Sequence, residues 1–291
     1  MKTMNTDFYW QYREELKNFI TSALKEDIGE ADHTSLACID VAQIQKAVLR
    51  TKETCVIAGV TLADAIFKQY DPKMEVSTSV HDGEQVHSGD VILRVEGNAQ
   101  SLLATERLVL NCMQRMSGIT TLTHRLAKKI AHTNCTLLDT RKTTPNFRYP
   151  EKWAVAIGGG VNHRMGLFDA LMLKDNHIDY CGGVRQALEK TASYLKRLGQ
   201  ELPVIVETRN LLEVEEVLQF PWISRILLDN MPPAMLREAV ELIDGKITTE
   251  ASGNINESNI VAIAETGVNC ISMGALTHSA PAVDLHLKAQ E

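Results

Sequence analysis

Residues 203–253 decide the fold, and they read PVIVETRNLLEVEEVLQFPWISRILLDNMPPAMLREAVELIDGKITTEASG. Short apolar runs stand at 203–206, 225–228 and 247–249, and amphipathic stretches with helical spacing stand between them at 211–218 and 233–243. Strands that alternate with helices at this spacing predict a parallel sheet covered by helices.

The same alternation continues on both sides of this stretch. Further strands are predicted at 135–138, 171–173 and 270–273, and further helices at 184–198 and 258–266. Five of the six strands are followed by a charged side chain, and Gly274 follows the last. The carboxyl ends of all strands converge on one face in a parallel α/β barrel, whereas an open sheet gathers only those at a switch point. The pattern therefore favours a barrel, and six visible units make it a short or incomplete one.

The first part of the chain has a different pattern. An amphipathic helix is predicted over 7–25, short β-like segments at 46–51, 54–58, 75–80 and 91–95, and one helix at 61–70. This order predicts a small α+β domain. The region from Ser101 to about Lys129 predicts a long helix, interrupted near Ser117-Gly118, that carries the chain into the second domain.

Composition narrows the functional class. The chain has 291 residues and a formal net charge of −7, which argues against nucleic acid as the main partner, because phosphate backbones need a broad basic face. No apolar run has the length of a signal peptide or a membrane span, so we expect no membrane partner. Six scattered cysteines without a Cys-x-x-Cys pair indicate reduced thiols in a cytoplasmic protein.

One segment of this acidic chain is locally basic. Between Asp139 and His177 stand six Lys or Arg side chains and four acids. Four of these cations, with His163 nearby, form a cationic arc of the predicted ring: Arg141, Lys142, Arg164 and Lys174. Guanidinium forks and ammonium groups that converge suit a substrate with two or more carboxylates.

Other strand ends suggest a metal and a phosphate. Glu207 and Asp229 follow neighbouring strands, and two acids at the same end of a barrel suit Mg²⁺, which takes its other ligands from substrate oxygens. The turns Ser252-Gly253-Asn254 and Gly274-Ala275 resemble the phosphate-binding loops after the last strands of a barrel. The three sites together indicate transfer of a phosphorylated group.

Simpler interpretations remain open for each residue alone. A single strand-end cation is more often structural, and Glu207 and Asp229 could serve only to neutralise the basic segment. Gly158-Gly159-Gly160 favours a tight turn over a phosphate cradle, since the glycine spacing of the known fingerprints is missing. The coincidence of all strand ends carries the prediction.

Ordered motifs along the chain resemble one known family. They are Glu26-Asp27-Ile28-Gly29 with Thr34-Ser35, Glu106-Arg107, Asn111, Ser117-Gly118, Thr140-Arg141-Lys142-Thr143-Thr144-Pro145, Glu151-Lys152, Gly158-Gly159-Gly160, His163-Arg164-Met165-Gly166-Leu167, Lys174-Asp175-Asn176-His177, Leu227-Leu228-Asp229-Asn230 and Gly274-Ala275-Leu276-Thr277-His278-Ser279. They closely resemble the motifs of the decarboxylating quinolinate phosphoribosyltransferase family, and the similarity covers nearly the whole chain.

This resemblance implies an architecture. The family fold is an α/β protein with an N-terminal α/β sandwich followed by an incomplete parallel α/β barrel of six to seven strands. We therefore place the sandwich at residues 1–117, joined by the C-terminal tail 275–291, and the catalytic barrel at 118–274. The resemblance also implies a homodimer whose active site is shared between subunits.

The resemblance further implies a role for each site residue. The set expected to hold quinolinate is Arg141, Lys142, His163, Arg164 and Lys174, with Arg107 contributed by the neighbouring subunit. The set expected to hold phosphoribosyl pyrophosphate is Glu207, Asp229, Ser252, Gly253, Asn254 and Gly274, and Glu207 and Asp229 also bind its Mg²⁺. The catalytic residues are expected to be Lys142, Lys174, Glu207 and Asp229.

Three positions depart from the family pattern. Asn254 and Asn146 stand where glycines are common, and Asn adopts unusual φ values less readily than Gly but more readily than other residues. Ile205 stands where an acid is frequent, which leaves the acidic arc one charge poorer. None of these changes removes a cationic ligand.

The implied activity is transfer of phosphoribosyl from phosphoribosyl pyrophosphate to quinolinate with decarboxylation. The products would be nicotinate mononucleotide, pyrophosphate and carbon dioxide, in de novo NAD biosynthesis. Two alternatives are a phosphoribosyltransferase for another heterocycle, which would need fewer cations, and a homologue that binds polyanions without turnover.

Overall fold

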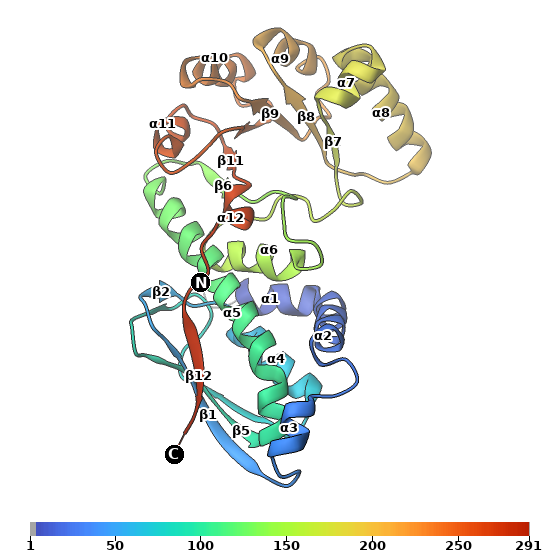
Figure 1. Ribbon diagram of the computed structural model, residues 1–291. Helices are drawn as coiled ribbons and strands as arrows, with labels where there is room; N and C mark the ends of the chain where they lie inside the picture. Colours follow the sequence, from blue (N-terminus) through green and yellow to red (C-terminus); the bar gives the residue numbers. More distant parts are fainter. Residues whose placement is uncertain (1–3, 291) are drawn as a thin grey trace. The chain divides into compact units, whose positions relative to one another are not determined.

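The computed structural model describes residues 4–290, and the chain divides into two compact units (Figure 1). Unit 1 comprises Met1–His124, Thr143–Gly159 and Leu276–Glu291, and unit 2 comprises Arg125–Lys142 and Gly160–Ala275. The predicted domain boundary at residues 117 and 118 remains a prediction.

Unit 1 is built on an antiparallel sheet. Its helices are α1 (Met4–Gln11), α2 (Arg13–Ile28), α3 (His33–Cys38), α4 (Val60–Tyr70) and α6 (Arg148–Ile157), and its strands are β1 (Ile44–Thr51), β2 (Cys55–Val56), β3 (Glu75–Thr78), β4 (Gln85–Val86), β5 (Val91–Asn98) and β12 (Leu285–Ala289). Four strands pair in the order β12-β1-β5-β3, and β2 pairs with β4.

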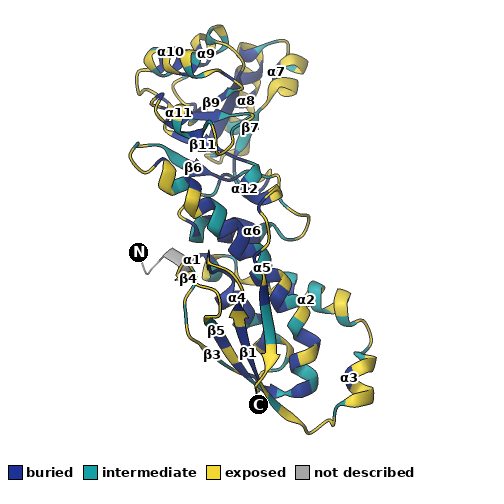
Figure 2. Ribbon diagram, turned by 60° about the vertical axis from the view of Figure 1, so that its left-hand side comes forward, coloured by how far each residue is buried: buried dark blue, intermediate teal, exposed yellow. Residues whose placement is uncertain are grey.

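The core of unit 1 lies between this sheet and its helices (Figure 2). α2 buries Leu16 and Ile20, and α4 buries Leu62, Ile66 and Phe67, at spacings that place them on one helix face. The chain ends in this unit, because β12 pairs antiparallel with β1.

The long helix α5 (Ala99–Lys129) is continuous, so the predicted interruption near Ser117-Gly118 is wrong. Glycine suggested a break there because it destabilises helix interiors. In the structure, a Cβ at Gly118 would overlap the carbonyl oxygen of Pro281. Gly118 therefore serves close packing of the C-terminal segment on the helix.

Unit 2 has the predicted parallel sheet. Its strands are β6 (Thr136–Leu138), β7 (Leu171–Leu173), β8 (Val204–Thr208), β9 (Arg225–Asp229), β10 (Thr248–Ser252) and β11 (Cys270–Ser272), and its helices are α7 (Asp175–Cys181), α8 (Val184–Leu198), α9 (Leu211–Val217), α10 (Pro233–Ile243) and α11 (Ile260–Ala264), with α12 (Ala275–His278) following β11. Figure 1 shows α8, α9 and α10 on one side of this sheet.

The strand order of this sheet is that of a barrel with one open seam. The order β6-β11-β10-β9-β8-β7 places each strand beside its neighbour in the chain, except that β6 and β7 are not paired. An open doubly wound sheet would reverse direction at a switch point, and this order does not. The predicted incomplete barrel is confirmed, and residues 139–170 connect the two strands that border the seam.

Two further features concern the chain as a whole. All six cysteines are free. None of the helices formed by residues 4–290 combines the length and the apolar character that crossing a bilayer would require.

Candidate active site

The register of the parallel strands gathers predicted site residues on one face of the sheet, which we call the inner face. Glu207 of β8 pairs with Leu227 of β9, and Asp229, two residues further along, pairs with Ser252 at the end of β10. Paired residues and residues two apart point to the same side of a sheet. Glu207, Asp229 and Ser252 therefore share the inner face near the carboxyl ends of their strands.

A lysine and a glutamate meet at this edge. Lys174 follows β7, and its Nζ lies 3.3 Å from Oε2 of Glu207. The main-chain N–H of Asp175 donates to Oε1 of Glu207 at 3.2 Å. Glu207 is buried while Lys174 is half exposed, so this pair fits the simpler interpretation that an acid neutralises a cation.

Asp229 is linked to the predicted phosphate-binding turn by amide side chains. Nδ2 of Asn230 donates to Oδ2 of Asp229 at 2.7 Å, and Oδ1 of Asn230 accepts from Nδ2 of Asn254 at 2.9 Å. The φ angles of Asn230, Gly253 and Asn254 are 52°, 93° and 52°, in the left-handed region. Asn adopts this region more readily than other side-chain-bearing residues, so Asn254 keeps the turn that a glycine would make.

Two guanidinium groups of the basic segment lie close enough for their charges to repel. Burial, followed by the nearby positive charge of Arg141, lowers the pKa of Arg164, although Asp169 partly offsets both. Nη1 of Arg164 donates to the carbonyl of Ala170 at 2.9 Å. Nε of Arg141 is buried and has no hydrogen-bond partner among residues 4–290. This pair has the electrostatic character of a site for an anion.

Asp169 holds the loop that carries Arg164. Its carboxylate accepts from the main-chain N–H groups of Met165 and Gly166 at 2.7 and 2.9 Å. Burial acts to raise the pKa of Asp169, but these hydrogen bonds and the charge of Arg164 outweigh it and lower the pKa.

Sequence reasoning identified only His163 as a functional member of a polar network that lies behind the cations. Its members are Asp139, Asn162, His163, Arg225 and Glu250, of which Asp139 and Glu250 are completely buried. Oδ1 of Asp139 accepts from the main-chain N–H of His163 at 2.8 Å, and Nε2 of His163 lies 3.3 Å from Oε2 of Glu250. Period-two alternation could have found Glu250, because it lies two residues before Ser252 on the same strand.

The remaining predicted residues lie in less constrained positions. Lys142 is exposed in the loop after β6, where its main-chain N–H donates to Oγ1 of Thr140 at 3.0 Å. Gly274 follows β11 and is half buried. Arg107 is exposed on α5 in unit 1, whereas the other predicted ligands belong to unit 2.

Part of the basic segment has a structural role. Glu151 of α6 is completely buried, accepts from the N–H and hydroxyl of Thr144 at 2.9 and 2.8 Å, and pairs with Arg115 at 3.1 Å. Gly159 has a φ of 89°, and a Cβ at Gly158 would crowd α5. The predicted tight turn is confirmed.

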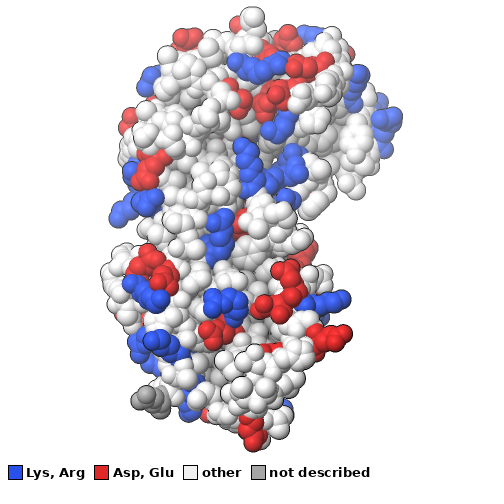
Figure 3. Space-filling view, in the orientation of Figure 1, with Lys and Arg blue, Asp and Glu red and all other residues white. Residues whose placement is uncertain are grey.

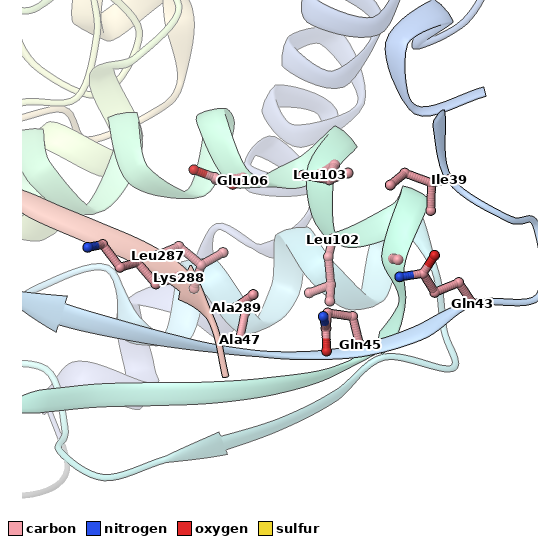
Figure 4. Close-up of a pocket in the computed structure, with 11 residues that line it drawn as sticks. Ile39, Gln43, Gln45, Ala47, Leu102, Leu103, Glu106, Leu287, Lys288 and Ala289 are labelled. Atoms are coloured by element: carbon pink, nitrogen blue, oxygen red, sulfur yellow. The ribbon is translucent and has the colours of Figure 1, made fainter. Parts of the chain in front are cut away.

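Charges of both signs are mixed across the surface drawn in Figure 3, where Lys and Arg stand next to Asp and Glu. A separate cavity of about 180 Å³ lies in unit 1 between α5, β1 and β12 (Figure 4). Ile39, Leu102, Leu103 and Leu287 contribute to its apolar lining. Lys288 is the one cation among its lining residues, and Glu106 lines it as well, so the cavity does not suit a polyanion and is not the candidate active site.

The acidic pair fits a divalent cation that shares its ligands with a substrate. Carboxylate oxygens are ligands that Mg²⁺ prefers, and Glu207 and Asp229 share the inner face on adjacent strands. Within residues 4–290, no group of three or more His, Cys, Asp or Glu side chains is placed to hold a metal by itself. A cation at this position would take its remaining ligands from substrate oxygens.

Two family models match the chain in succession. The model described as Quinolinate phosphoribosyl transferase, N-terminal domain, matches residues 32–117, and the model described as Quinolinate phosphoribosyl transferase, C-terminal domain, matches residues 119–288.

Similar proteins cover nearly the same length. Quinolinate phosphoribosyltransferase [decarboxylating] 1b of Nicotiana tabacum is 46% identical over 289 residues, covering 94% of this chain and 82% of the relative. A probable nicotinate-nucleotide pyrophosphorylase [carboxylating] of Bacillus subtilis is 37% identical over 276 residues, covering 94% and 93%. The solved structure of the nicotinate-nucleotide pyrophosphorylase from Francisella tularensis superposes with a TM-score of 0.87 at 37% identity, covering 95% of this chain and 96% of that one.

Proposed function

This chain belongs to the quinolinate phosphoribosyltransferase family, and we propose that its active site is the inner, carboxyl-terminal edge of the unit 2 barrel. The protein is a decarboxylating quinolinate phosphoribosyltransferase that forms nicotinate mononucleotide in NAD biosynthesis. The proposals below assign roles to its residues.

Arg141 and Arg164 bind the two carboxylates of quinolinate, with Lys142, His163 and Lys174 completing the pocket. The observation that carries this assignment is the pair of guanidinium groups whose charges repel, one of which has a buried Nε without a hydrogen-bond partner among residues 4–290. A dianionic pyridine would supply the missing acceptors, since guanidinium forks match carboxylates. A heterocyclic substrate with a single carboxylate would leave one of these cations without a partner.

Ser252, Gly253, Asn254 and Gly274 bind the 5′-phosphate of phosphoribosyl pyrophosphate. Backbone with φ in the left-handed region, as at Gly253 and Asn254, commonly turns main-chain N–H groups toward an anion. Asp229 lies beside this turn and accepts the ribose hydroxyls, while Glu207 occupies the same face one strand away.

Glu207 and Asp229 would also hold Mg²⁺ together with pyrophosphate oxygens. When bound, the cation would supply charge neutralisation for the leaving pyrophosphate. The chain's own contribution is to orient the two substrates so that the pyridine nitrogen meets ribose C1, which needs no covalent nucleophile. Lys142 and Lys174 contribute fixed positive charge at the same edge.

Decarboxylation follows from the product of this first step. The ring nitrogen becomes a pyridinium once it is bonded to ribose C1, and a pyridinium accepts the electron pair left by the adjacent carboxylate. Carbon dioxide leaves, a proton takes its place on the ring, and nicotinate mononucleotide remains. The cations hold the other carboxylate throughout, so the ring stays in register with the ribose.

The test is steady-state kinetics with quinolinate, phosphoribosyl pyrophosphate and Mg²⁺, measuring nicotinate mononucleotide and carbon dioxide. Loss of one charged hydrogen bond predicts that Arg141→Ala and Arg164→Ala each raise the KM for quinolinate by about 10- to 100-fold. Arg237→Ala, which removes an exposed guanidinium from α10, is the matched control. Wild-type KM values for quinolinate in both Arg141→Ala and Arg164→Ala would refute the placement of quinolinate beside these side chains.

We also propose a homodimer in which Arg107 completes the neighbouring subunit's quinolinate site. Arg107 is exposed and has no hydrogen bond or ion pair within residues 4–290, and Leu103, one helical turn away, is 46% exposed. Leu103 also lines the apolar cavity of unit 1 (Figure 4). Arg107 and Leu103 therefore offer a second subunit a charged group and an apolar surface next to one another.

Complementation tests this shared site. Arg107→Ala and Lys174→Ala should each be inactive, and mixed subunits should regain about a quarter of wild-type activity, because half the dimers then carry one intact site. No recovery from subunits shown to exchange would place Arg107 outside the partner's site.

We propose the cytoplasm as the compartment, because all six cysteines are free, as in reducing compartments. Two plant relatives are named as mitochondrial and chloroplastic, and the chain covers 82% and 77% of their lengths. Fractionation of the source cells tests this proposal, and recovery of the protein in an organelle fraction would refute it.

A further inference from the structure

A buried carboxylate lies directly behind the proposed quinolinate site. Glu250 is on the inner face of β10 and has no exposed surface. Its Oε2 accepts from Nη1 of Arg225 at 2.8 Å and lies 3.3 Å from Nε2 of His163. Burial acts to raise the pKa of Glu250, but contacts with His163, Ser272 and Arg225 outweigh it and lower the pKa, so the group is ionised at neutral pH.

His163 is held at three points. Its main-chain N–H donates to Asp139, its Nδ1 accepts from the main-chain N–H of Arg164 at 2.7 Å, and its Nε2 faces Glu250. An acceptor at Nδ1 requires the ring hydrogen to sit on Nε2, which is the nitrogen directed at the carboxylate. Both ring nitrogens are therefore engaged inside unit 2.

The main-chain contact at Nδ1 connects this ring to a substrate ligand. The main-chain N–H of Arg164 donates to the ring of His163, and the guanidinium of Arg164 donates to the carbonyl of Ala170. This hydrogen bond ties the orientation of the imidazole ring to the main chain of Arg164.

We propose that Glu250 is a positioning residue for quinolinate binding, which acts through His163 to present Arg164 beside Arg141. His163 then serves as the link between Glu250 and Arg164. This inference rests on the proposed role of Arg141 and Arg164 in binding quinolinate.

Stability alone is a weak reason for this network. A buried ion pair must overcome the desolvation of both charges, and apolar side chains of similar volume often stabilise a fold as well or better. Glu250 is completely buried and its Oε2 already meets Arg225 and His163, so a cation from solution would have only Oε1 to approach. The charged and titratable groups around it are His163, Arg225 and the thiol of Cys270.

Glu250→Gln tests the inference, because it keeps the shape of the side chain and removes its charge. We expect the KM for quinolinate to rise by about 10-fold or more, because a change in the residue that orients a substrate-binding side chain typically has an effect of this size. The KM for phosphoribosyl pyrophosphate should stay within about threefold, and kcat should fall less than the quinolinate KM rises. Glu257→Gln, which removes an exposed acid with two surface ion pairs, is the matched control and should leave both KM values unchanged.

Nitrogen NMR of labelled histidine gives a readout apart from activity. The wild-type protein should show His163 with its hydrogen on Nε2, and Glu250→Gln should shift that signal. If the single variant does not fold, the double variant Glu250→Gln with Arg225→Met removes the buried charge and its partly buried partner together and should show the same split between the two KM values.

The inference is overturned by an unchanged quinolinate KM in a folded variant, by equal losses for both substrates, or by failure of both variants to fold. Arg164→Ala separates it from the proposed function. If Arg164→Ala binds quinolinate normally, the proposed placement of the substrate is wrong. If Arg164→Ala binds quinolinate weakly but Glu250→Gln binds it normally, only the positioning role of Glu250 is wrong.

Discussion

Replacing Gly253 with alanine should damage the phosphoribosyl half of the site selectively. The φ of Gly253 is 93°, and a Cβ there would overlap the side chain of Asn230. Asn230 would have to move, which breaks its hydrogen bonds to Asp229 and Asn254.

The magnitude follows from three contributions. A side chain in left-handed backbone costs about 1 kcal/mol. Loss of the neutral amide hydrogen bond to Asn254 costs about 1 kcal/mol, and loss of the bond to the Asp229 carboxylate costs about 2 kcal/mol. The free energy of unfolding should therefore fall by about 4 kcal/mol. If Asp229 loses its orientation, kcat/KM for phosphoribosyl pyrophosphate should fall by about 30-fold, which corresponds to about 2 kcal/mol.

Urea denaturation and steady-state kinetics measure these two effects. Gly199→Ala is the matched control, because Gly199 has a φ of 66° and open space where the Cβ would be. It should lose only about 1 kcal/mol of stability and no activity. Equal stability losses for the two variants, or an unchanged kcat/KM for phosphoribosyl pyrophosphate in Gly253→Ala, would refute the reasoning.

Further predictions concern stability and thiol chemistry. Glu151→Gln should lower the free energy of unfolding by about 3 kcal/mol, measured in urea, because it breaks a buried ion pair and weakens the anchoring of Thr144; a loss below about 1 kcal/mol would contradict this. Cys38 should react with iodoacetamide before Cys112, since Cys38 is exposed and burial raises the pKa of Cys112 to about 12; mass spectrometry of partly labelled protein would detect the reverse order. The lowered pKa of Asp169 means that its contribution to stability is complete above its unfolded pKa of about 3.9 and is lost as pH falls through the folded pKa. Asp169→Asn should therefore be less stable than wild type near neutral pH and approach it at about pH 2; a constant difference in unfolding free energy across that range would contradict the assignment.

The sheet of unit 2 could be predicted because its pattern is local. Apolar runs bounded by charged residues mark strand ends whatever packs around them, and helices α8 and α10 have the predicted bounds. The interruption predicted in α5 was wrong for the opposite reason. Whether Gly118 breaks a helix or admits a neighbour depends on residues near Pro281, far away in the sequence.

The charged residues at the strand ends could be identified from the sequence, but their pairing could not. A count of charges identifies Arg141, Lys174 and Glu207. It does not show that Lys174 pairs with Glu207, or that Nε of Arg141 is buried without a hydrogen-bond partner among residues 4–290. The buried acids Asp139 and Glu250 were missed as functional groups, since a carboxylate at a strand end has the same sequence signal whether it faces substrate or another side chain.

The open seam between β6 and β7 sets most of the proposed quinolinate ligands apart from the proposed ligands of phosphoribosyl pyrophosphate. Arg141, His163 and Arg164 all lie outside helix α6 in residues 139–170, the segment that connects those strands, whereas Asp229 and Ser252 belong to the hydrogen-bonded sheet. Loops tolerate substitution and insertion far better than strands whose register is fixed. Selectivity for the acceptor ring can therefore evolve or be engineered in the connecting segment, while the strands keep the phosphoribosyl donor unchanged.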